Sequence, residues 1–497
     1  MTAYQELERR HARIAAIGDA LGILGWDTQT IMPDGANEGR AEQIATLSVI
    51  AHEMSTDPRL ADLLAEAEDD DSLDSWRRAN LREMRRNHAH ATAVPAELVE
   101  AMSKAASVCE MTWRTARADS DFAALLPSLR TVLDCVRESA AAKGAAMGLS
   151  PYDALLDEYD PGARTARIDA LFADLADFLP DLIGRVLDKQ AGQPVPARPV
   201  GPFPVEAQRA LGVSMMERMG FDFQRGRLDV SLHPFCGGAT DDVRMTTRYD
   251  EADFANALMA VIHETGHGLY EQGRPRAHLA QPVGQARGMA VHESQSLIME
   301  MQAARSAEFI TWLAPVVREA FGGTGPEWEV DNLRRLYGRV ERGFIRVDAD
   351  EVTYPAHVIL RYRLEKALVS GDLDLADLPG AWNDGMLELV GVAPPDDRRG
   401  CLQDIHWPGG GWGYFPSYTL GAMTAAQLFA AAREAEPEIV PALGRGDFAP
   451  LVGWLRTNVH QTGCFHASAD ALLTAATGRP LDVSVFKRHL ETRYLGS

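Results

Sequence analysis

Hydrophobic side chains recur every three or four positions through the first 190 or so residues of the chain. One helical face near the N-terminus carries Leu7, Ile14, Ile17, Leu21 and Leu24. The same spacing returns between residues 155 and 187, and alanine, leucine, glutamate and arginine, which favour helix, dominate throughout. The pattern predicts helix after helix, with breaks at 32–35, 94–95 and 159–162, where proline or glycine interrupts it.

The pattern changes after this helical part. Residues 193–204 are rich in proline and cannot continue a helix, and we expect an ordered surface crossing there rather than a domain linker. Valine and threonine between residues 227 and 250 predict short strands. Helices resume at Glu251 and continue to the end, apart from two loops rich in glycine and proline at 271–284 and 407–418. The sequence therefore predicts a mainly α fold with a small β element.

Composition narrows the class of protein. The 497 residues include 71 acidic against 49 basic side chains, a net charge of −22, so we expect neither nucleic acid nor an anionic membrane as a partner. Five scattered cysteines form no C-x-x-C pair and fit a reducing compartment. The N-terminus carries no signal-peptide pattern, and no run of about 18 apolar residues appears. These features together predict a cytoplasmic protein.

One short motif has the spacing of a metal-binding site with a neighbouring general base. His263-Glu264-Thr265-Gly266-His267 reads H-E-x-x-H within an apolar-periodic segment at 253–272. Residues four apart share a helix face, so both imidazoles can bind one zinc ion, with Glu264 beside it as a candidate general base. Phe254, Leu258 and Ile262 form an apolar stripe that supports a helix with one buried side. Gly266 and Gly268 weaken that helix but leave room for another chain segment to approach closely.

A catalytic zinc site needs a third protein ligand and an open position. The metzincin extension is excluded, because Tyr270 and Gly273 stand where its glycine and histidine would fall. The remaining candidates are Glu271, Glu293 and Glu300. We predict Glu293, because the loop before it lets its helix fold back against the first, and Glu300 lies two turns further along the same face. His292 points elsewhere on that helix and reads as a core or loop histidine.

Motifs spread along nearly the whole chain resemble the M32 metallocarboxypeptidases, the carboxypeptidase Taq family. The matching stretches are 26–33, 150–157, 159–162, 233–235, 242–246, 263–267, 292–295, 345–350, 354–357, 402–407 and 413–418. In that family the glutamate of His-Glu-Ser is the third zinc ligand, and it falls on Glu293. Leu297 and Cys401 depart from the family pattern, and Leu297 changes the charge expected near the site.

The resemblance implies a single helical domain over residues 1–497 with a deep active-site groove. Residues 1–200 would wall that groove, and residues 201–497 would form the zinc-binding catalytic part. It also implies a homodimer that removes residues stepwise from the C-termini of peptides, with broad specificity and poor tolerance of C-terminal proline. The metal expected is one zinc ion per chain, although a His2Glu site also accepts cobalt or manganese.

Roles follow from the chemistry of this reaction. Glu264 would accept a proton from the attacking water and donate it to the leaving amine. A free C-terminal carboxylate is best recognised by a fixed arginine, for which Arg346 is our first candidate and Arg244 our second. The tetrahedral intermediate needs hydrogen-bond donors, for which we predict His406 and Tyr418. His233 and His357 also lie in matching stretches but receive no role.

Two other readings remain open from the sequence. A zinc peptidase that cuts internally or at the N-terminus would carry the same H-E-x-x-H motif. A non-enzymatic protein could instead use His263 and His267 as a structural metal site. The intact Glu264 argues against the second reading, because a closed structural site needs no base.

Overall fold

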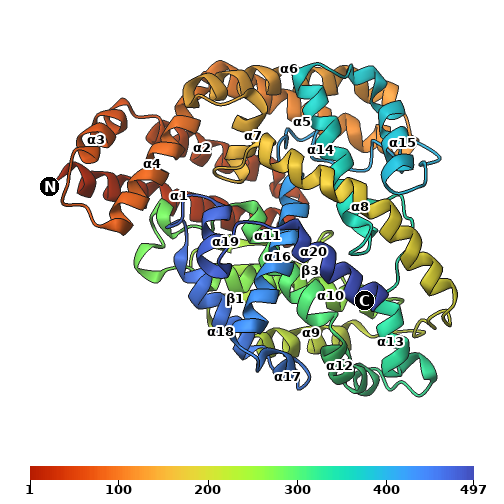
Figure 1. Cartoon of the computed structure of the whole chain (residues 1–497). Coiled ribbons are helices and arrows are strands. Elements are labelled where there is room, and N and C mark those ends of the chain that lie inside the picture. Colours follow the sequence, from red (N-terminus) through yellow and green to blue (C-terminus); the bar gives the residue numbers. More distant parts are fainter. Residues whose placement is uncertain (497) are drawn as a thin grey trace.

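The computed structural model describes residues 1–496 and is predominantly helical (Figure 1). The N-terminal helices are α1 Ala3–Thr30, α2 Asn37–Ser55, α3 Pro58–Glu68, α4 Ser75–Ala93, α5 Ala96–Asp119, α6 Phe122–Met147, α7 Pro151–Tyr159 and α8 Thr165–Ala191. The three predicted breaks are confirmed, since α1, α4 and α7 each end at one. A further break follows α5 at Ser120-Asp121, where the sequence has neither proline nor glycine.

The central segment carries the strands and the helix of the H-E-x-x-H motif. Its elements are α9 Val205–Met219, β1 Gly226–Val230, β2 Cys236–Ala239, β3 Asp242–Thr247, α10 Phe254–Gly273, α11 Met289–Leu297 and the π-helix η5 Ile298–Ala304. The strands form one sheet in the order β1-β3-β2, with β3 parallel to β1 and antiparallel to β2. The small β element is confirmed, although the pattern did not resolve β2 as a separate strand.

The C-terminal part is again helical. Its elements are α12 Ala307–Ala320, α13 Val330–Tyr337, α14 Tyr354–Ser370, α15 Leu378–Leu389, α16 Pro416–Ala435, α17 Ile439–Leu443, α18 Ala449–Asn458, α19 Ala469–Thr477, α20 Val483–Leu490 and the π-helix η10 Glu491–Leu495. No helix within residues 1–496 is both long and apolar enough to cross a membrane.

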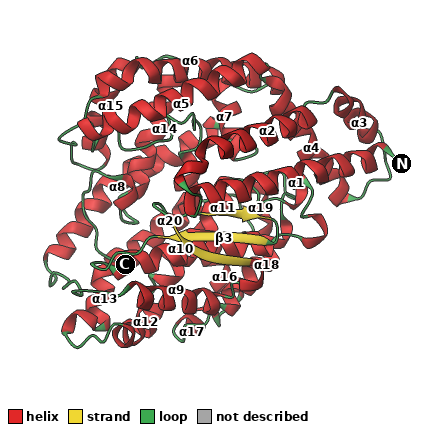
Figure 2. Ribbon diagram, turned by 180° about the vertical axis from the view of Figure 1, so that it is seen from behind, coloured by secondary structure: helices red, strands yellow, loops and turns green. Residues whose placement is uncertain are grey.

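The sheet lies between α1 and α10, and both contacts depend on glycines. A Cβ on Gly22 of α1 would stand 2.1 Å from the carbonyl oxygen of Gly238 in β2. A Cβ on Gly268 of α10 would stand 2.8 Å from the sulfur of Met245 in β3. Figure 2 shows α1 running alongside the three strands. The close approach expected at Gly268 is therefore present, and it anchors the H-E-x-x-H helix on the sheet.

The proline-rich stretch is an ordered crossing. The backbone of Ala197 both donates to and accepts from the side-chain amide of Asn332 in α13, each at 2.8 Å. Phe203 is buried at the end of the crossing and packs edge-on against Phe254, the first residue of α10. The main hydrophobic core extends from α5 to η10, and a smaller core lies among α1, α3 and α4.

Candidate active site

The helix α10 presents the two motif histidines on one face. Asp253 caps its N-terminus by accepting hydrogen bonds from the backbone N–H groups of Ala255 and Asn256. The predicted stripe of Phe254, Leu258 and Ile262 is fully buried and fixes the rotation of the helix. One turn separates His263 from His267, and their ring centroids lie 5.0 Å apart.

Two glycines allow the helix that carries Glu293 to pack unusually closely. A Cβ on Gly266 of α10 would stand 2.3 Å from the carbonyl oxygen of Gln295 in α11. A Cβ on Gly421 of α16 would stand 2.9 Å from the Glu293 side chain on the other side of α11. Because no side chain separates these backbones, α11 is clamped between α10 and α16, and Glu293 is held over the two imidazoles.

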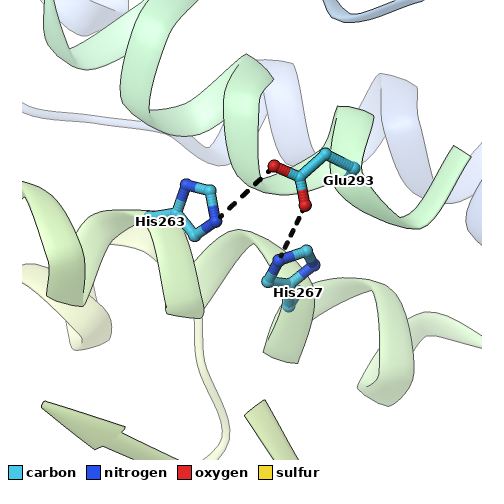
Figure 3. A group of neighbouring side chains, drawn as sticks. All are labelled: His263, His267 and Glu293. Atoms are coloured by element: carbon cyan, nitrogen blue, oxygen red, sulfur yellow. Dashed lines mark ion pairs between the residues drawn. The ribbon is translucent and has the colours of Figure 1, made fainter. Parts of the chain in front are cut away.

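The three side chains converge, as Figure 3 shows. The carboxylate of Glu293 lies 4.0 Å from His263 Nε2 through one oxygen and 3.7 Å from His267 Nε2 through the other. One donor atom from each residue lies within 4.8 Å of the others. Tetrahedral bonds of about 2 Å would place donors roughly 3 to 3.5 Å apart, so these residues can close on one zinc ion with small adjustments. Since the His263 side chain stays 22% exposed, water can reach the cluster.

The electrostatics of the cluster favour a cation. Burial would lower the pKa of His263, but the carboxylates of Glu300, Glu293 and Glu264 outweigh it and raise that pKa to about 10. Burial raises the pKa of Glu293, and the positive charge of His263 only partly opposes this. The three carboxylates thus place strong negative potential where the two rings meet. Two imidazoles and a carboxylate also match the donor preference of zinc.

The outer nitrogen of each imidazole is fixed. His263 Nδ1 donates to Glu300 Oε2 at 3.0 Å, and Arg305 donates to the other oxygen of Glu300 at 2.7 Å. His267 Nδ1 donates to the backbone carbonyl of His292 at 3.1 Å. Both Nδ1 atoms therefore keep a proton, and Nε2 is the nitrogen that each ring presents to the centre of the cluster, where a cation would take the place of a second proton on His263.

The other two glutamates considered from the sequence lie outside the cluster. Glu300 contacts the back of His263, as its position two turns beyond Glu293 suggested. Glu271 remains on α10 but accepts from His292 Nε2 at 2.9 Å and pairs with Arg274 at 2.8 Å. His292 in turn stacks on His267 with ring centroids 4.6 Å apart. Glu271 therefore supports the cluster from behind through His292.

Glu264 stands beside the cluster on the next position of α10. Its side chain is buried, and burial raises its pKa to about 7, against the lowering effect of His263. A carboxyl group with a pKa near neutrality can both take up and release a proton at physiological pH. The residue therefore has the ionisation behaviour that a general base requires.

Arg346 is buried next to this cluster. Its Nε and Nη2 both donate to Oδ1 of Asp404, at 3.0 and 2.9 Å, and its Nη1 reaches only the hydroxyl of Tyr354 at 3.4 Å. The guanidinium is close enough to Glu293 for its charge to oppose the rise that burial causes in the pKa of that carboxyl. Asp404 thus fixes one edge of Arg346 and leaves the other with spare donor capacity.

His406 and Tyr418 lie beside Arg346. His406 Nε2 is 3.1 Å from the Tyr418 hydroxyl, and the Arg346 guanidinium stacks 4.8 Å from the Tyr418 ring centroid. Burial lowers the pKa of His406 to about 4, so the ring is neutral at pH 7. Burial raises the pKa of Tyr418 to about 12, so its hydroxyl keeps its proton. Both groups therefore stay neutral at pH 7 and can donate hydrogen bonds beside Arg346.

Arg244 has different surroundings. It lies on β3, pairs with Asp242 at 2.6 Å and stacks on Trp26 of α1 at 4.5 Å from the ring centroid. Among residues 1–496 no contact joins its side chain to His263, His267 or Glu293. The structure therefore brings Arg346, but not Arg244, into the neighbourhood of the cluster.

Two acidic residues that position the site received no role from the sequence. Asp404 holds Arg346 and also accepts from Arg361 Nε at 2.6 Å. Asp160, at the end of α7, accepts from the Ser417 hydroxyl at 2.5 Å and from the Ala290 backbone N–H at 2.7 Å. Asp160 thereby ties α11 and α16 to the N-terminal helices. Both acids lie in stretches that match the family, which was the one signal that could have singled them out.

Comparison with known proteins assigns the chain to a family. The model of the carboxypeptidase Taq (M32) metallopeptidases matches residues 6–494. Thermostable carboxypeptidase 1 of Thermus thermophilus is 37% identical over 99% of this chain and 98% of the relative, and carboxypeptidase 1 of Bacillus subtilis is 36% identical over 97% and 96%.

A solved structure agrees over the same extent. Metallocarboxypeptidase 1 of Trypanosoma cruzi superposes with a TM-score of 0.97 at 41% identity, covering 99% of both chains. Sequence and architecture therefore agree from end to end. The chain belongs to the carboxypeptidase Taq (M32) family and is a metallocarboxypeptidase.

Proposed function

We propose that the enzyme is a zinc-dependent carboxypeptidase that hydrolyses the last peptide bond of peptides with a free C-terminus. The observation that carries this proposal is the convergence of His263, His267 and Glu293 beside the near-neutral carboxyl of Glu264. Zinc bound there would activate water and polarise the scissile carbonyl. Cobalt or manganese would also fit this donor set.

Glu264 would move the proton. As a carboxylate it accepts a proton from the attacking water, and as a carboxylic acid it donates that proton to the departing amine. Burial keeps its pKa near 7, although a cation in the neighbouring cluster would lower that value. Its place on α10, one residue after His263, keeps the carboxyl at the edge of the cluster in every step.

Arg346 would bind the C-terminal carboxylate. Its guanidinium is buried, fixed by Asp404 and near Glu293, so a carboxylate paired with it would place the last peptide bond beside the metal cluster. Charge-assisted hydrogen bonds to a fixed guanidinium are strong and directional. An amidated C-terminus would lose this ion pair, which accounts for a requirement for a free carboxylate.

Tyr418 and His406 would stabilise the oxyanion of the tetrahedral intermediate. Because His406 is neutral, its Nε2–H can donate to the Tyr418 oxygen and leave the phenolic proton free for substrate. Preformed donors in a buried site stabilise developing charge without reorganisation. We further propose broad specificity, with C-terminal proline disfavoured, and a groove walled by the N-terminal helices.

One experiment separates this function from its rivals. Zinc content and product release are measured for three versions of one short peptide: free, amidated and N-acetylated. The proposal expects the free and N-acetylated peptides to lose their last residue and the amidated one to resist. A Glu264→Gln variant should retain zinc, and its turnover number should fall by at least about 100-fold. Internal cleavage, equal cleavage of the amidated peptide, or full activity of Glu264→Gln would refute the proposal.

A further inference from the structure

A cavity of about 910 Å³ lies on a face of the molecule that the reaction does not use. Its walls come from the end of α8, η5, α12, α13, α16, α20 and η10, and none of His263, His267 or Glu293 lines it. Two of its walls, α13 and the segment that follows α20, lie side by side near the C-terminus in Figures 1 and 2. The volume is that of a pocket for a small molecule.

The cavity is strongly basic although the chain is acidic. Seven arginines and one lysine line it, against one glutamate and one aspartate, whereas the whole chain has 71 acidic and 49 basic side chains. A concentration of one charge against the trend of the surface focuses the electrostatic potential inside a concave wall. The cavity therefore attracts anions, although the net charge of the whole chain is negative.

Some of these cations are already neutralised. Arg305 pairs with Glu300, Arg493 pairs with Glu351, and Arg339 pairs with a neighbouring glutamate. These three paired arginines contribute less net attraction than their number suggests.

Four further guanidinium groups have no such partner. Within residues 1–496, no carboxylate lies within ion-pair distance of Arg334, Arg335, Arg433 or Arg488, and all four line the cavity. They come from three separate helices, namely α13, α16 and α20. Arg335 is half-buried and the other three are exposed, so an anion that enters the cavity meets four positive charges that no carboxylate of the described residues neutralises.

Buried donors in the same wall also lack partners. The Nε atoms of Arg305 and Arg335 and the hydroxyl of Tyr337 are buried without a hydrogen bond in the structure, and all three residues line the cavity. Tyr337 as a whole is only 8% exposed. Unsatisfied buried donors are rare in folded proteins and commonly mark a bound ligand or ion.

We propose that this cavity binds a small phosphate-bearing anion. Guanidinium forks match the geometry of phosphate oxygens, and several of them around one pocket can share a multiply charged group. Because the unpaired cations surround a compact space from three helices, they suit a compact ligand better than an extended acidic peptide. Free phosphate and the phosphates of a metabolite share this chemistry.

The test measures binding directly and does not depend on peptidase activity. Inorganic phosphate and a hexose bisphosphate are titrated into the zinc-loaded enzyme by calorimetry, at an ionic strength held constant with sodium chloride. The proposal expects saturable binding of one ligand per chain. Tighter binding of the bisphosphate would indicate a site for a phosphorylated metabolite, and tighter binding of inorganic phosphate would indicate a site for free phosphate. An oligoglutamate peptide is titrated in parallel as the acidic-peptide alternative.

Matched variants locate the site. The double variant Arg335→Gln/Arg433→Gln should weaken binding by at least about tenfold. The control Arg318→Gln/Arg363→Gln removes the same charge from exposed ion pairs elsewhere and should bind like the parent. Arg488→Gln, at an exposed position, provides a second variant if the first fails to fold.

Three results would overturn the proposal. The first is no saturable binding of either phosphate compound at about 10 mM, where even a weak specific site would fill. The second is equal weakening in the cavity variant and in the control. The third is tighter binding of the oligoglutamate than of both phosphate compounds.

Discussion

His263 donates its Nδ1–H to Glu300, a residue seven positions beyond Glu293 on the facing helix. The pairing fixes the ring so that Nε2, with its lone pair, faces Glu293. It also places a second carboxylate behind the ring, and Arg305 balances that charge. Glu300 lies in the π-helix η5, which continues α11 and places this carboxylate two turns beyond Glu293.

Replacing Glu300 should weaken metal binding without removing a ligand. In Glu300→Gln the side-chain amide no longer accepts as strongly from His263 Nδ1 and leaves Arg305 without its charge partner. We expect zinc affinity to fall about 10- to 100-fold, as is typical when the partner of a ligating histidine is lost. Competition with a chromogenic chelator measures this affinity, and an unchanged value would contradict the role assigned to Glu300.

The contact between Gly421 and Glu293 predicts that a larger residue at position 421 weakens both the fold and zinc binding. A methyl group in Gly421→Ala would meet the Glu293 side chain at 2.9 Å and push α11 away from α16. We expect a destabilisation of about 1–3 kcal/mol from overpacking, together with weaker zinc retention. Gly453→Ala in α18 is the matched control, because its new Cβ meets nothing within 4 Å. Equal effects of the two changes in thermal unfolding and zinc content would refute the clamp.

Substitutions of Arg346 and of Arg244 should have different effects on KM. Arg346→Lys keeps the charge but loses the planar fork, so KM for peptides with a free C-terminus should rise about tenfold or more, the equivalent of one charge-assisted hydrogen bond. Arg244→Ala should alter KM much less, because Arg244 pairs with Asp242 beside Trp26. Steady-state kinetics on short peptides provide the measurement. A larger effect at Arg244 would exchange the two assignments.

The buried acids Asp404 and Glu351 predict loss of stability in acid. Burial would raise the pKa of Asp404, but the guanidiniums of Arg361 and Arg346 outweigh it and lower that pKa. Burial is likewise outweighed at Glu351, chiefly by Arg493 and His489. A carboxyl with a lowered folded-state pKa stabilises the fold above its unfolded pKa of about 4, and this contribution is lost as the pH falls further.

Chemical denaturation between pH 7 and pH 3 tests this dependence. The free energy of unfolding should be nearly level above about pH 5 and fall steeply below pH 4. In Asp404→Asn part of the acid-dependent loss should disappear, since that position no longer titrates. A parent protein whose stability is unchanged at pH 3 would contradict the assignment.

The sequence predicted most of the fold and the central cluster, for identifiable reasons. Helical periodicity located the long helices, and the H-E-x-x-H spacing placed two histidines on one face of α10. The loop before residue 290 singled out Glu293, with which the family resemblance agreed, and the matching stretch at 345–350 then pointed to Arg346. What the sequence could not show was long-range pairing: Asp404 lies 58 positions from Arg346 in the chain, and no local pattern connects them. The strand β2, Cys236–Ala239, was missed because two of its four residues are glycines.

The basic cavity is a second feature that depends on long-range packing and that the sequence alone could not show. Its arginines are spread from Arg305 to Arg493, and in the sequence each resembles an ordinary surface charge. Only the packing of α13, α16 and α20 around one space reveals that several of them have no counter-ion. The net charge of −22 led us to expect neither nucleic acid nor an anionic membrane as a partner, and no sequence pattern indicated a site for a small anion.

The central claim is that His263, His267 and Glu293 bind one metal ion. Crystals of the zinc-loaded protein, measured with X-rays just above and just below the zinc absorption edge, test it directly. We predict a single strong anomalous peak per chain, about 2 Å from both Nε2 atoms and from a carboxylate oxygen of Glu293. A peak elsewhere, or no peak at those three side chains in protein loaded with zinc, would contradict the account.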